Sequence, residues 1–282
     1  MFFAIEGGAE RRFAAVMAPW RAGGWKPSRV TLISTLILAA VPRAGAQFTD
    51  SPFTVQPGKL VGQVELMSLA LDRHDPGQAS KPYSAQAVAV TRLTTGLMQD
   101  LDLQVGLDWF LREKFDLHGR HDSNSGMGAL SLRPRYTFWK DPALGAAAAV
   151  EPYIRIPTRN DGVGSGAMEG GVAVPWAIGK PGGTTFGAMA EWDLVRNDND
   201  TGYDSVWYVS GLLSQPVIGS LLLYAESSLA ASSAKASDWA FTVGGGASWR
   251  LALGTRLDCS LHRTVTRGAN DWNPVLRLRW EF

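Results

Sequence analysis

The densest group of side chains that could do chemistry is a short polar stretch in the first half of the chain. It contains His118, His121, Asp122, Ser123 and Asn124. A serine nucleophile, a histidine base and an asparagine that orients the histidine could together hydrolyse a lipid ester. Neighbours in one flexible loop are not held in that geometry without a rigid support, so a solvated external loop is the favoured interpretation. Lipid hydrolysis stays as the less favoured alternative.

Two further loops have a composition that suggests ligand binding. Gly162-Val163-Gly164-Ser165-Gly166 is rich in glycine but precedes no predicted helix, so we do not expect it to cradle a phosphate. Asn197-Asp198-Asn199-Asp200 could hold Ca²⁺ weakly, although a solvated loop explains it more simply. The single cysteine, Cys259, and the four scattered histidines do not make a zinc site. We therefore expect no catalytic residues, no metal and no cofactor.

A larger set of ionisable and aromatic side chains occupies alternate positions of strand-like segments. Alternate residues of a β-strand share one face of the sheet, so this set should line one interior. We expect these residues to line a lumen and to contact a small-molecule permeant: Glu65, Asp102, Asp108, Arg133, Arg135, Glu151, Tyr153, Arg155, Glu169, Glu191, Asp193, Tyr224, Glu226, Arg277 and Arg279. The same parity adds Phe110, Arg256 and Asp258, and Arg92 from a segment that alternates poorly.

The clearest alternation runs from Leu101 to Arg112. Leucine, valine and tryptophan take one parity, whereas the other parity begins Asp102, Gln104 and Gly106. A helix would scatter these residues around its circumference, so the period of two predicts a strand. The apolar parity would face lipid and the polar parity the lumen, because a charge at the middle of a membrane costs about 2–4 kcal/mol.

Twelve such segments are predicted after residue 58. They cover residues 59–71, 84–97, 101–112, 127–138, 144–156, 167–178, 184–195, 204–214, 220–231, 239–249, 255–265 and 274–282. Short connections alternate strictly with longer polar ones, among them 72–83, 113–126 and 232–238. This is the layout of an all-β, transmembrane, antiparallel up-and-down barrel with short periplasmic turns, longer external loops and both termini on the short-turn side.

The first 46 residues read as a secretory signal peptide. An apolar run from Val30 to Val41 follows Lys26 and Arg29 and precedes the small residues Ala44-Gly45-Ala46. The run is shorter than the roughly 20 residues of a spanning helix. We expect cleavage before Gln47, a periplasmic lead-in over residues 47–58, and a barrel over residues 59–282. Whether synthesis starts at Met1 or Met17 stays open.

The chain ends on a strand with one apolar and one charged face. Leu276, Leu278, Trp280 and Phe282 alternate with charged residues, as expected of a closing barrel strand. The terminal Phe282 is then the kind of signal that the barrel-assembly machinery reads. Tryptophans cluster near the predicted strand ends, at Trp109, Trp139, Trp176, Trp192, Trp239, Trp249 and Trp280. These positions favour aromatic girdles at the membrane interfaces over the core of a soluble sandwich.

Several short motifs resemble one family. They are Phe48–Gly58 followed by Val64-Glu65-Leu66, then Leu101–Leu107, Pro152–Thr158, Leu257-Asp258, and Asp271–Pro274 with the final strand. Together they resemble the outer-membrane barrels of the meta-pathway phenol-degradation family, which are often called transporters. The chain departs from the family pattern at Gly128-Ala129, where the family usually has Gly-Asp. The resemblance implies a barrel in the cell outer membrane that passes small, aromatic or hydrophobic molecules.

Function is therefore expected to be passive transport, with outer-membrane lipid, the assembly machinery and a small permeant as partners. The near balance of 27 basic and 26 acidic residues gives no sign of a nucleic-acid partner. The inward charges allow two interpretations. They either form a polar conduit that orients a permeant, or they pair across strands and fill a structural barrel without transport. Twelve strands lie between filled and open barrels, so strand number does not decide between them.

Overall fold

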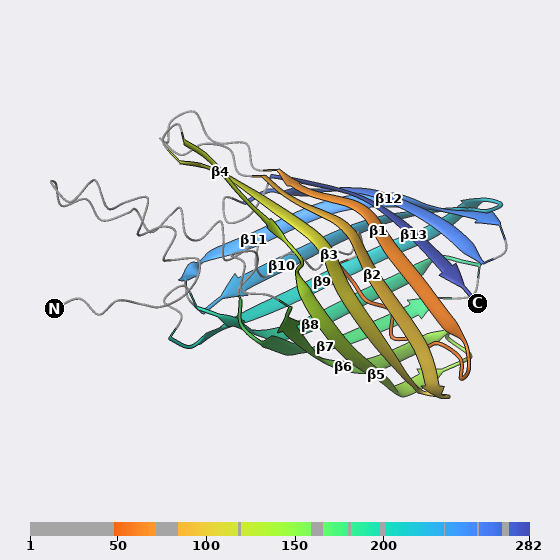
Figure 1. The fold of residues 1–282 in the computed structure, drawn as a ribbon. Helices are drawn as coiled ribbons and strands as arrows, with labels where there is room; N and C mark the ends of the chain where they lie inside the picture. The colour runs from red at the N-terminus through yellow and green to blue at the C-terminus, as the bar shows by residue number, and fades with distance from the viewer. Residues whose placement is uncertain are drawn as a thin grey trace, which may run out of the picture.

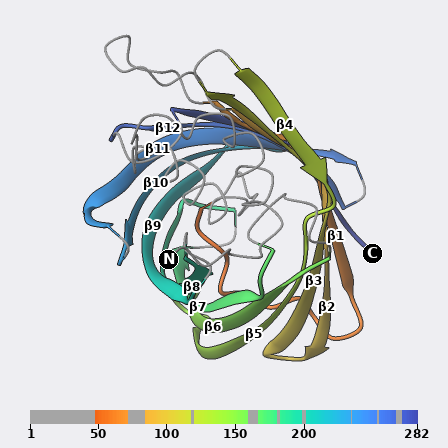
Figure 2. The same cartoon turned by 60° about the vertical axis from the view of Figure 1, so that its left-hand side comes forward.

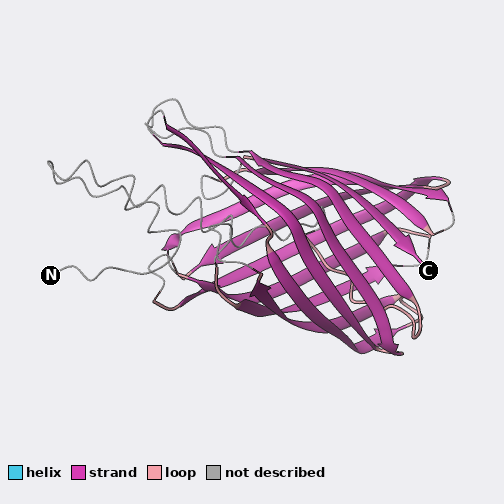
Figure 3. Ribbon diagram, in the orientation of Figure 1, coloured by secondary structure: helices cyan, strands magenta, loops and turns pink. Residues whose placement is uncertain are grey.

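A computed structural model describes residues 48–71, 84–117, 120–158, 166–179, 182–197, 201–233, 235–252, 254–266 and 271–282. The predicted signal peptide lies outside these residues. Within them the regular structure is entirely β (Figure 3). None of the described segments is a helix long and apolar enough to cross a membrane.

The strands form one antiparallel sheet that curls into a tilted barrel (Figure 1). They are β1 (Leu60–Leu71), β2 (Ser84–Met98), β3 (Leu101–Leu117), β4 (Arg120–Gly126), β5 (Ala129–Asp141), β6 (Ala146–Pro157), β7 (Glu169–Gly179), β8 (Thr185–Arg196), β9 (Tyr203–Ile218), β10 (Leu221–Ser232), β11 (Lys235–Ala252), β12 (Thr255–Thr264) and β13 (Trp272–Glu281). Sequential neighbours pair, except that β4 and β5 both pair with β3; β1 also pairs with β13, and the pairing of β2 with β3 completes the ring.

The thirteen strands occupy twelve positions around the ring. β3 pairs with β5 along its first half and with β4 along its second half, so β4 and β5 form one position interrupted at residues 127–128. Gly128 sits in this interruption, where a Cβ atom would lie 2.6 Å from the Cβ of Asp108. The prediction of a twelve-stranded, antiparallel up-and-down barrel is confirmed.

The short connections also appear as predicted. Four of them contain a glycine in the left-handed region, with φ of 59° at Gly145, 74° at Gly182, 51° at Gly219 and 76° at Gly254. Glycine adopts this conformation at little steric cost, which lets the chain reverse within a few residues. At the same end of the barrel the N–H of Phe282 donates to the carbonyl oxygen of Leu60 at 2.9 Å. The first and last strands therefore meet on the short-turn side.

Two predicted long loops are wrong. Residues 113–126 are mostly strand, because β3 continues to Leu117 and β4 begins at Arg120. Residues 232–238 are likewise taken up mainly by β11, which begins at Lys235. In both places the polar residues look like loop in sequence but pair across a hairpin that extends beyond the apolar part of the wall. Polarity alone does not separate a solvated strand from a loop.

The two faces of the sheet separate apolar from ionic side chains, as the alternation predicted. Large apolar residues are exposed on the outside, including Phe138, Phe186 and Val209. Five of the seven tryptophans expected in girdles are exposed, whereas Trp192 and Trp280 are half-buried. Inside, carboxylates are almost fully covered: Glu65 is 0% exposed and Glu151 2% exposed. An apolar exterior around an ionic interior suits a barrel that crosses a membrane, not a soluble sandwich.

The alternation breaks at one level of the barrel. β1 has a bulge between Glu65 and Met67, and the only described non-glycine residue with positive φ, Ala89, lies at the matching level of β2. On β3 the inward position passes from Asp108 to Leu111, so Trp109 and Phe110 are both exposed. The predicted inward placement of Phe110 is not supported, because the alternation of buried and exposed residues shifts by one position between Asp108 and Leu111.

Candidate functional site

The barrel encloses a cavity of about 480 Å³. Figure 2 looks into the barrel and shows the first described segment of the chain inside it. The cavity is therefore bounded partly by the wall and partly by this inserted segment, residues 48–56. Its lining includes seven basic side chains: Lys59, Arg92, Arg133, Arg135, Arg155, Arg277 and Arg279. Four acids also line it: Asp50, Asp108, Glu191 and Glu281.

The inserted segment is fastened to the wall along its length. Asp50 pairs with Arg133, and Arg135 donates to the carbonyl oxygen of Ser51 at 2.7 Å. Further along, the hydroxyl of Thr137 donates to the carbonyl oxygen of Pro52 at 2.6 Å. These contacts come from β5, so one strand holds the middle of the segment. Nothing in the alternation pattern indicated that the expected lead-in enters the lumen.

The two ends of the inserted segment are held by other strands. The N–H of Phe48 donates to Oε2 of Glu226 on β10 at 3.2 Å, and the Phe48 ring packs edge-on against His262 with centroids 4.5 Å apart. At the other end the N–H of Val55 donates to Oδ2 of Asp102 at 2.8 Å. Gly96 lies against this end, where a Cβ atom would be 2.2 Å from the carbonyl oxygen of Gln56. The segment thus spans the lumen between opposite walls.

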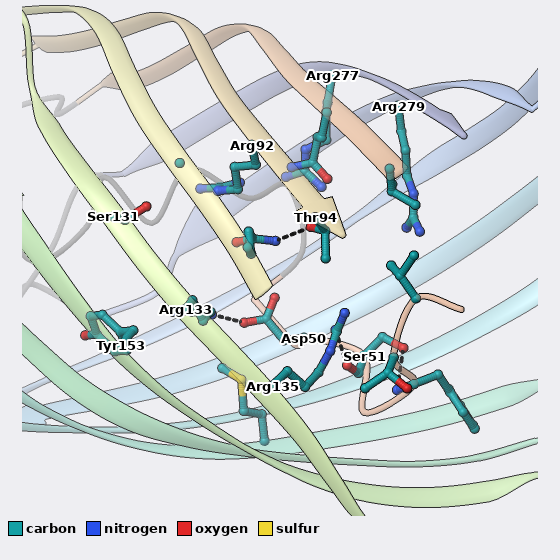
Figure 4. Close-up of a pocket in the computed structure, with 18 of the residues that line it drawn as sticks. Asp50, Ser51, Arg92, Thr94, Ser131, Arg133, Arg135, Tyr153, Arg277 and Arg279 are labelled. Atoms are coloured by element: carbon teal, nitrogen blue, oxygen red, sulfur yellow. Dashed lines mark hydrogen bonds and ion pairs between the residues drawn. The ribbon is translucent and has the colours of Figure 1, made fainter. Parts of the chain in front are cut away.

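One wall of the cavity is densely paired, and Figure 4 shows one of its pairs, between Arg133 and Asp50. Nη2 of Arg135 lies 2.6 Å from Oδ2 of Asp102 and Nη1 lies 3.7 Å from Oε1 of Glu151. Arg133 pairs with Asp50, with Glu151 at 3.5 Å and with Glu191 at 3.7 Å. Each arginine therefore has at least two carboxylates, and those on the strands are almost completely buried. We call these residues (Asp50, Asp102, Arg133, Arg135, Glu151 and Glu191) the paired wall.

The paired wall continues into a second layer nearer β7. Arg155 lies 3.5 Å from Asp108 and 3.8 Å from Glu169. The hydroxyl of Tyr153 donates to Oδ1 of Asp193 at 2.5 Å, and the Arg133 guanidinium lies 4.8 Å from the Tyr153 ring centroid. Here the ionic residues predicted to face a permeant are mainly occupied with one another.

The adjoining wall, formed by β1, β2 and β13, has more arginine than it pairs at close range. Arg277 has Glu65 at 4.0 Å and Arg279 has Glu281 at 3.7 Å, while Arg92 has no carboxylate at ion-pair distance among the described residues. The amide oxygen of Gln63, in the orientation that satisfies its neighbours, accepts from Nε of Arg277 at 3.2 Å and from Nη1 of Arg92 at 3.0 Å. We call Gln63, Arg92, Arg277 and Arg279 the arginine wall.

The predicted lumen residues divide into two groups. Those that line the cavity are Asp108, Arg133, Arg135, Tyr153, Arg155, Glu191, Arg277 and Arg279. Those outside the cavity lining are Glu65, Asp102, Glu151, Glu169, Asp193, Tyr224 and Glu226, all buried. Sequence reasoning missed Gln63 and the inserted segment, and it placed Gln104 on the lumen face without naming it as a permeant contact, whereas both glutamines line the cavity. Inward parity alone could have identified both glutamines.

The alternative chemical sites receive no support from the described residues. The side chains of His118, His121 and Asp122 lie outside them, as do the Gly162-to-Ser165 part of the glycine-rich loop and Asp198 to Asp200. Ser123 is exposed on β4, at the far end of the hairpin with β3. Neither the serine nor its neighbour Asn124 lines the cavity.

Comparison with known proteins agrees with this architecture. Residues 48–280 match the model of the family described as "Putative MetA-pathway of phenol degradation". A search of curated proteins found no match. Among solved structures, an outer membrane channel from Pseudomonas putida F1 superposes with a TM-score of 0.61 at 14% identity, covering 82% of this chain and 98% of that one. The transport unit of the autotransporter AIDA-I from Escherichia coli gives 0.52 at 11% identity, covering 92% and 100%. At these identities the likeness concerns the fold.

Proposed function

The chain belongs to the MetA-pathway phenol-degradation family, and from this premise we propose that it is an outer-membrane channel for passive passage of small molecules. The family match covers residues 48–280, essentially the whole described chain. The related barrel from Pseudomonas putida is itself an outer membrane channel. The apolar exterior supports insertion in lipid, and the short turns support a periplasmic position for both termini.

The observation that carries the proposal is the cavity that persists although a segment of the chain enters the lumen. A volume of about 480 Å³ falls in the range of roughly 300–1,000 Å³ that is usual for small-molecule sites. Its lining combines ions with Phe48, Phe53, Val61 and Met189, so a solute can find polar and apolar contacts there. Aromatic or hydrophobic solutes with a polar group suit such a lining.

A closed structural barrel is the second candidate, and the paired wall favours it. Arginines that each hold two buried carboxylates bridge strands β3, β5, β6 and β8. Together with the inserted segment they would seal a narrow lumen. The two candidates differ in whether the remaining cavity connects the two rims.

Planar-bilayer recording and liposome swelling with the purified protein decide between them. A channel gives discrete conductance steps, and liposomes containing it swell in small solutes at rates that fall with solute size. Electrically silent bilayers together with impermeant liposomes would support the sealed barrel. The control for detergent leakage is the same protein after heat denaturation. Liposomes prepared with it should not swell.

Assembly in the cell offers a separate test of the outer-membrane proposal. Phe282 is 73% exposed and its N–H makes one hydrogen bond, to Leu60. Deleting it removes about 1 kcal/mol of hydrogen bonding, so folding in vitro into detergent should continue. If the barrel-assembly machinery reads this residue, the amount of heat-modifiable barrel in outer-membrane fractions should fall several-fold. Normal insertion of the truncated protein would contradict this role.

A further inference from the structure

We propose that the arginine wall is a binding site for a small organic carboxylate. The inference rests on the proposed function in one respect, since the ligand would be a permeant held in the lumen. It adds a class of solute and the residues that recognise it. Figure 4 shows Arg92, Arg277 and Arg279 together in the upper part of the cavity, above Arg133 and Arg135.

The first argument is a shortage of acceptors. Three guanidinium groups have two carboxylates nearby, Glu65 and Glu281, at long ion-pair distances of 4.0 and 3.7 Å, so neither is close enough to accept a strong hydrogen bond, and both buried oxygens of Glu65 are themselves without a partner in the described structure. Each guanidinium carries five N–H donors that a protein normally satisfies when they are buried. Asp258, the cross-strand partner of Arg277 on β12, makes no ion pair with it in the described structure.

The second argument is the burial of an arginine that has an unsatisfied donor atom. Arg277 is 4% exposed and lines the cavity, and its Nη2 has no hydrogen-bond partner in the described structure. Nε of the neighbouring Arg279 is also without one. A buried, charged donor left unsatisfied is costly. A ligand oxygen in the cavity would supply the missing acceptor.

The third argument is the neutral bridge between two of the arginines. Arg92 and Arg277 both donate to the Gln63 amide oxygen, so their donor atoms lie within two hydrogen-bond lengths of each other. A glutamate at this position would neutralise the pair, whereas glutamine holds the two guanidiniums close and leaves their charge uncompensated. Two adjacent guanidiniums fit the planar, bidentate geometry of a carboxylate.

The shape of the surrounding wall leaves room for the body of such a ligand. The register runs from Arg92 through Gly106 and Ser131 to Arg155, so two small residues lie between two arginines. All four line the cavity. Phe53 and Met189 add apolar surface to the same lining. This mixture favours an organic carboxylate over a simple inorganic anion.

The test measures binding of 4-fluorobenzoate to the full barrel domain as it is purified, in detergent micelles, by fluorine NMR. Binding should be saturable at millimolar concentration, and acetate, benzyl alcohol and sulfate should compete poorly. Acetate has the charge without the ring, and benzyl alcohol has the ring without the charge. If sulfate or benzyl alcohol competed on equal terms with 4-fluorobenzoate, the proposed carboxylate site would be refuted.

Three variants locate the site. Arg92→Gln should weaken binding about ten-fold or more, since a hydrogen bond to a charged group contributes that much. Arg277→Lys keeps the charge but loses the planar fork, so it should also weaken binding although the net charge of the lumen is unchanged. Arg256→Gln is the matched control, because Arg256 faces Arg279 across β12 and β13 but does not line the cavity.

Equal weakening in the Arg256→Gln control would mean that only the general charge of the lumen matters, and the site would be refuted. Absence of any saturable binding to the unaltered protein would refute it as well. Both readouts are independent of conductance. Bilayer recording of the same preparation then shows separately whether the proposed channel function stands.

Discussion

Arginine side chains lie on both the paired wall and the arginine wall, but they have different partners on the two walls. On the paired wall Arg135 meets two buried carboxylates, one of them at 2.6 Å. On the arginine wall Arg92 meets a neutral amide and no carboxylate at ion-pair distance among the described residues. Both arginines lie in the same cavity. The difference between them is therefore in their partners.

This difference indicates how one lumen can be both rigid and receptive. A buried ion network with short, multiple contacts fixes the geometry of several strands at once. Arginines with unsatisfied donors leave a positive charge that a bound anion can neutralise. The inserted segment joins the first wall, through Asp50 and Ser51, and leaves the second one facing the cavity. The strongest tests are those in which equivalent substitutions on the two walls should give different results.

The largest effect is expected from Arg135→Leu. It leaves Asp102, which is 1% exposed, and Glu151, which is 2% exposed, short of a counter-ion. Breaking a buried pair by removing one partner costs about 3–5 kcal/mol. The free energy of unfolding, measured by denaturant titration of the barrel in lipid vesicles, should fall by that amount.

Arg135→Lys is the control, since it keeps the charge and should recover part of the loss. If Arg135→Leu lowered the free energy of unfolding by less than about 1 kcal/mol, the ion pair would contribute no more than a solvent-exposed ion pair does. The paired wall would then not be the rigid element that distinguishes the two sides.

A second test separates the inserted segment from the wall that holds it. In Gly96→Ala the new Cβ would lie 2.2 Å from the carbonyl oxygen of Gln56 and 2.4 Å from that of Val55. Backbone cannot yield as a flexible side chain does, so residues 55–56 should move out of the lumen. Single-channel conductance should rise several-fold while the unfolding free energy changes little.

Gly211→Ala is suited as the matched glycine control, because its nearest atom, Oγ of Ser227, would be 3.9 Å away. If both variants conduct like the unaltered protein, the inserted segment does not limit passage. The cavity beside the arginine wall would then have to be narrowed by something other than this segment.

The sequence predicted the wall of the barrel better than its contents. Period-two alternation separates lipid-facing from lumen-facing residues on most strands because the energetic difference between the two faces is large. It did not hold at Phe110, where the alternation of buried and exposed residues shifts by one position, and it failed at residues 113–126, where a polar hairpin resembles a loop. Bulges and solvated strand ends depend on pairing with neighbours, which a single strand does not encode.

Period-two alternation could not predict which charged side chains pair with one another inside the lumen. Parity placed Arg135 and Arg277 on the inner face but could not distinguish the first, with two acids, from the second, with one distant acid. That distinction depends on register between strands far apart in the chain. The inserted segment was missed because its anchors, such as Thr49 to Ser210 at 2.8 Å, join residues 161 positions apart.

The smallest expected effect on stability comes from Arg92→Gln, and it sharpens the comparison most directly. Arg92 donates to the neutral Gln63 amide and has no carboxylate at ion-pair distance among the described residues. Replacing the guanidinium by an amide therefore leaves no buried carboxylate without a close partner, and the unfolding free energy should change by less than about 1 kcal/mol. The measurement is the same denaturant titration used for Arg135→Leu.

A loss of unfolding free energy comparable with that of Arg135→Leu would show that Arg92 is as firmly paired as Arg135. The two walls would then not differ in how their arginines are paired. A small change, combined with loss of carboxylate binding, would show that Arg92 is retained for a ligand and not for the fold.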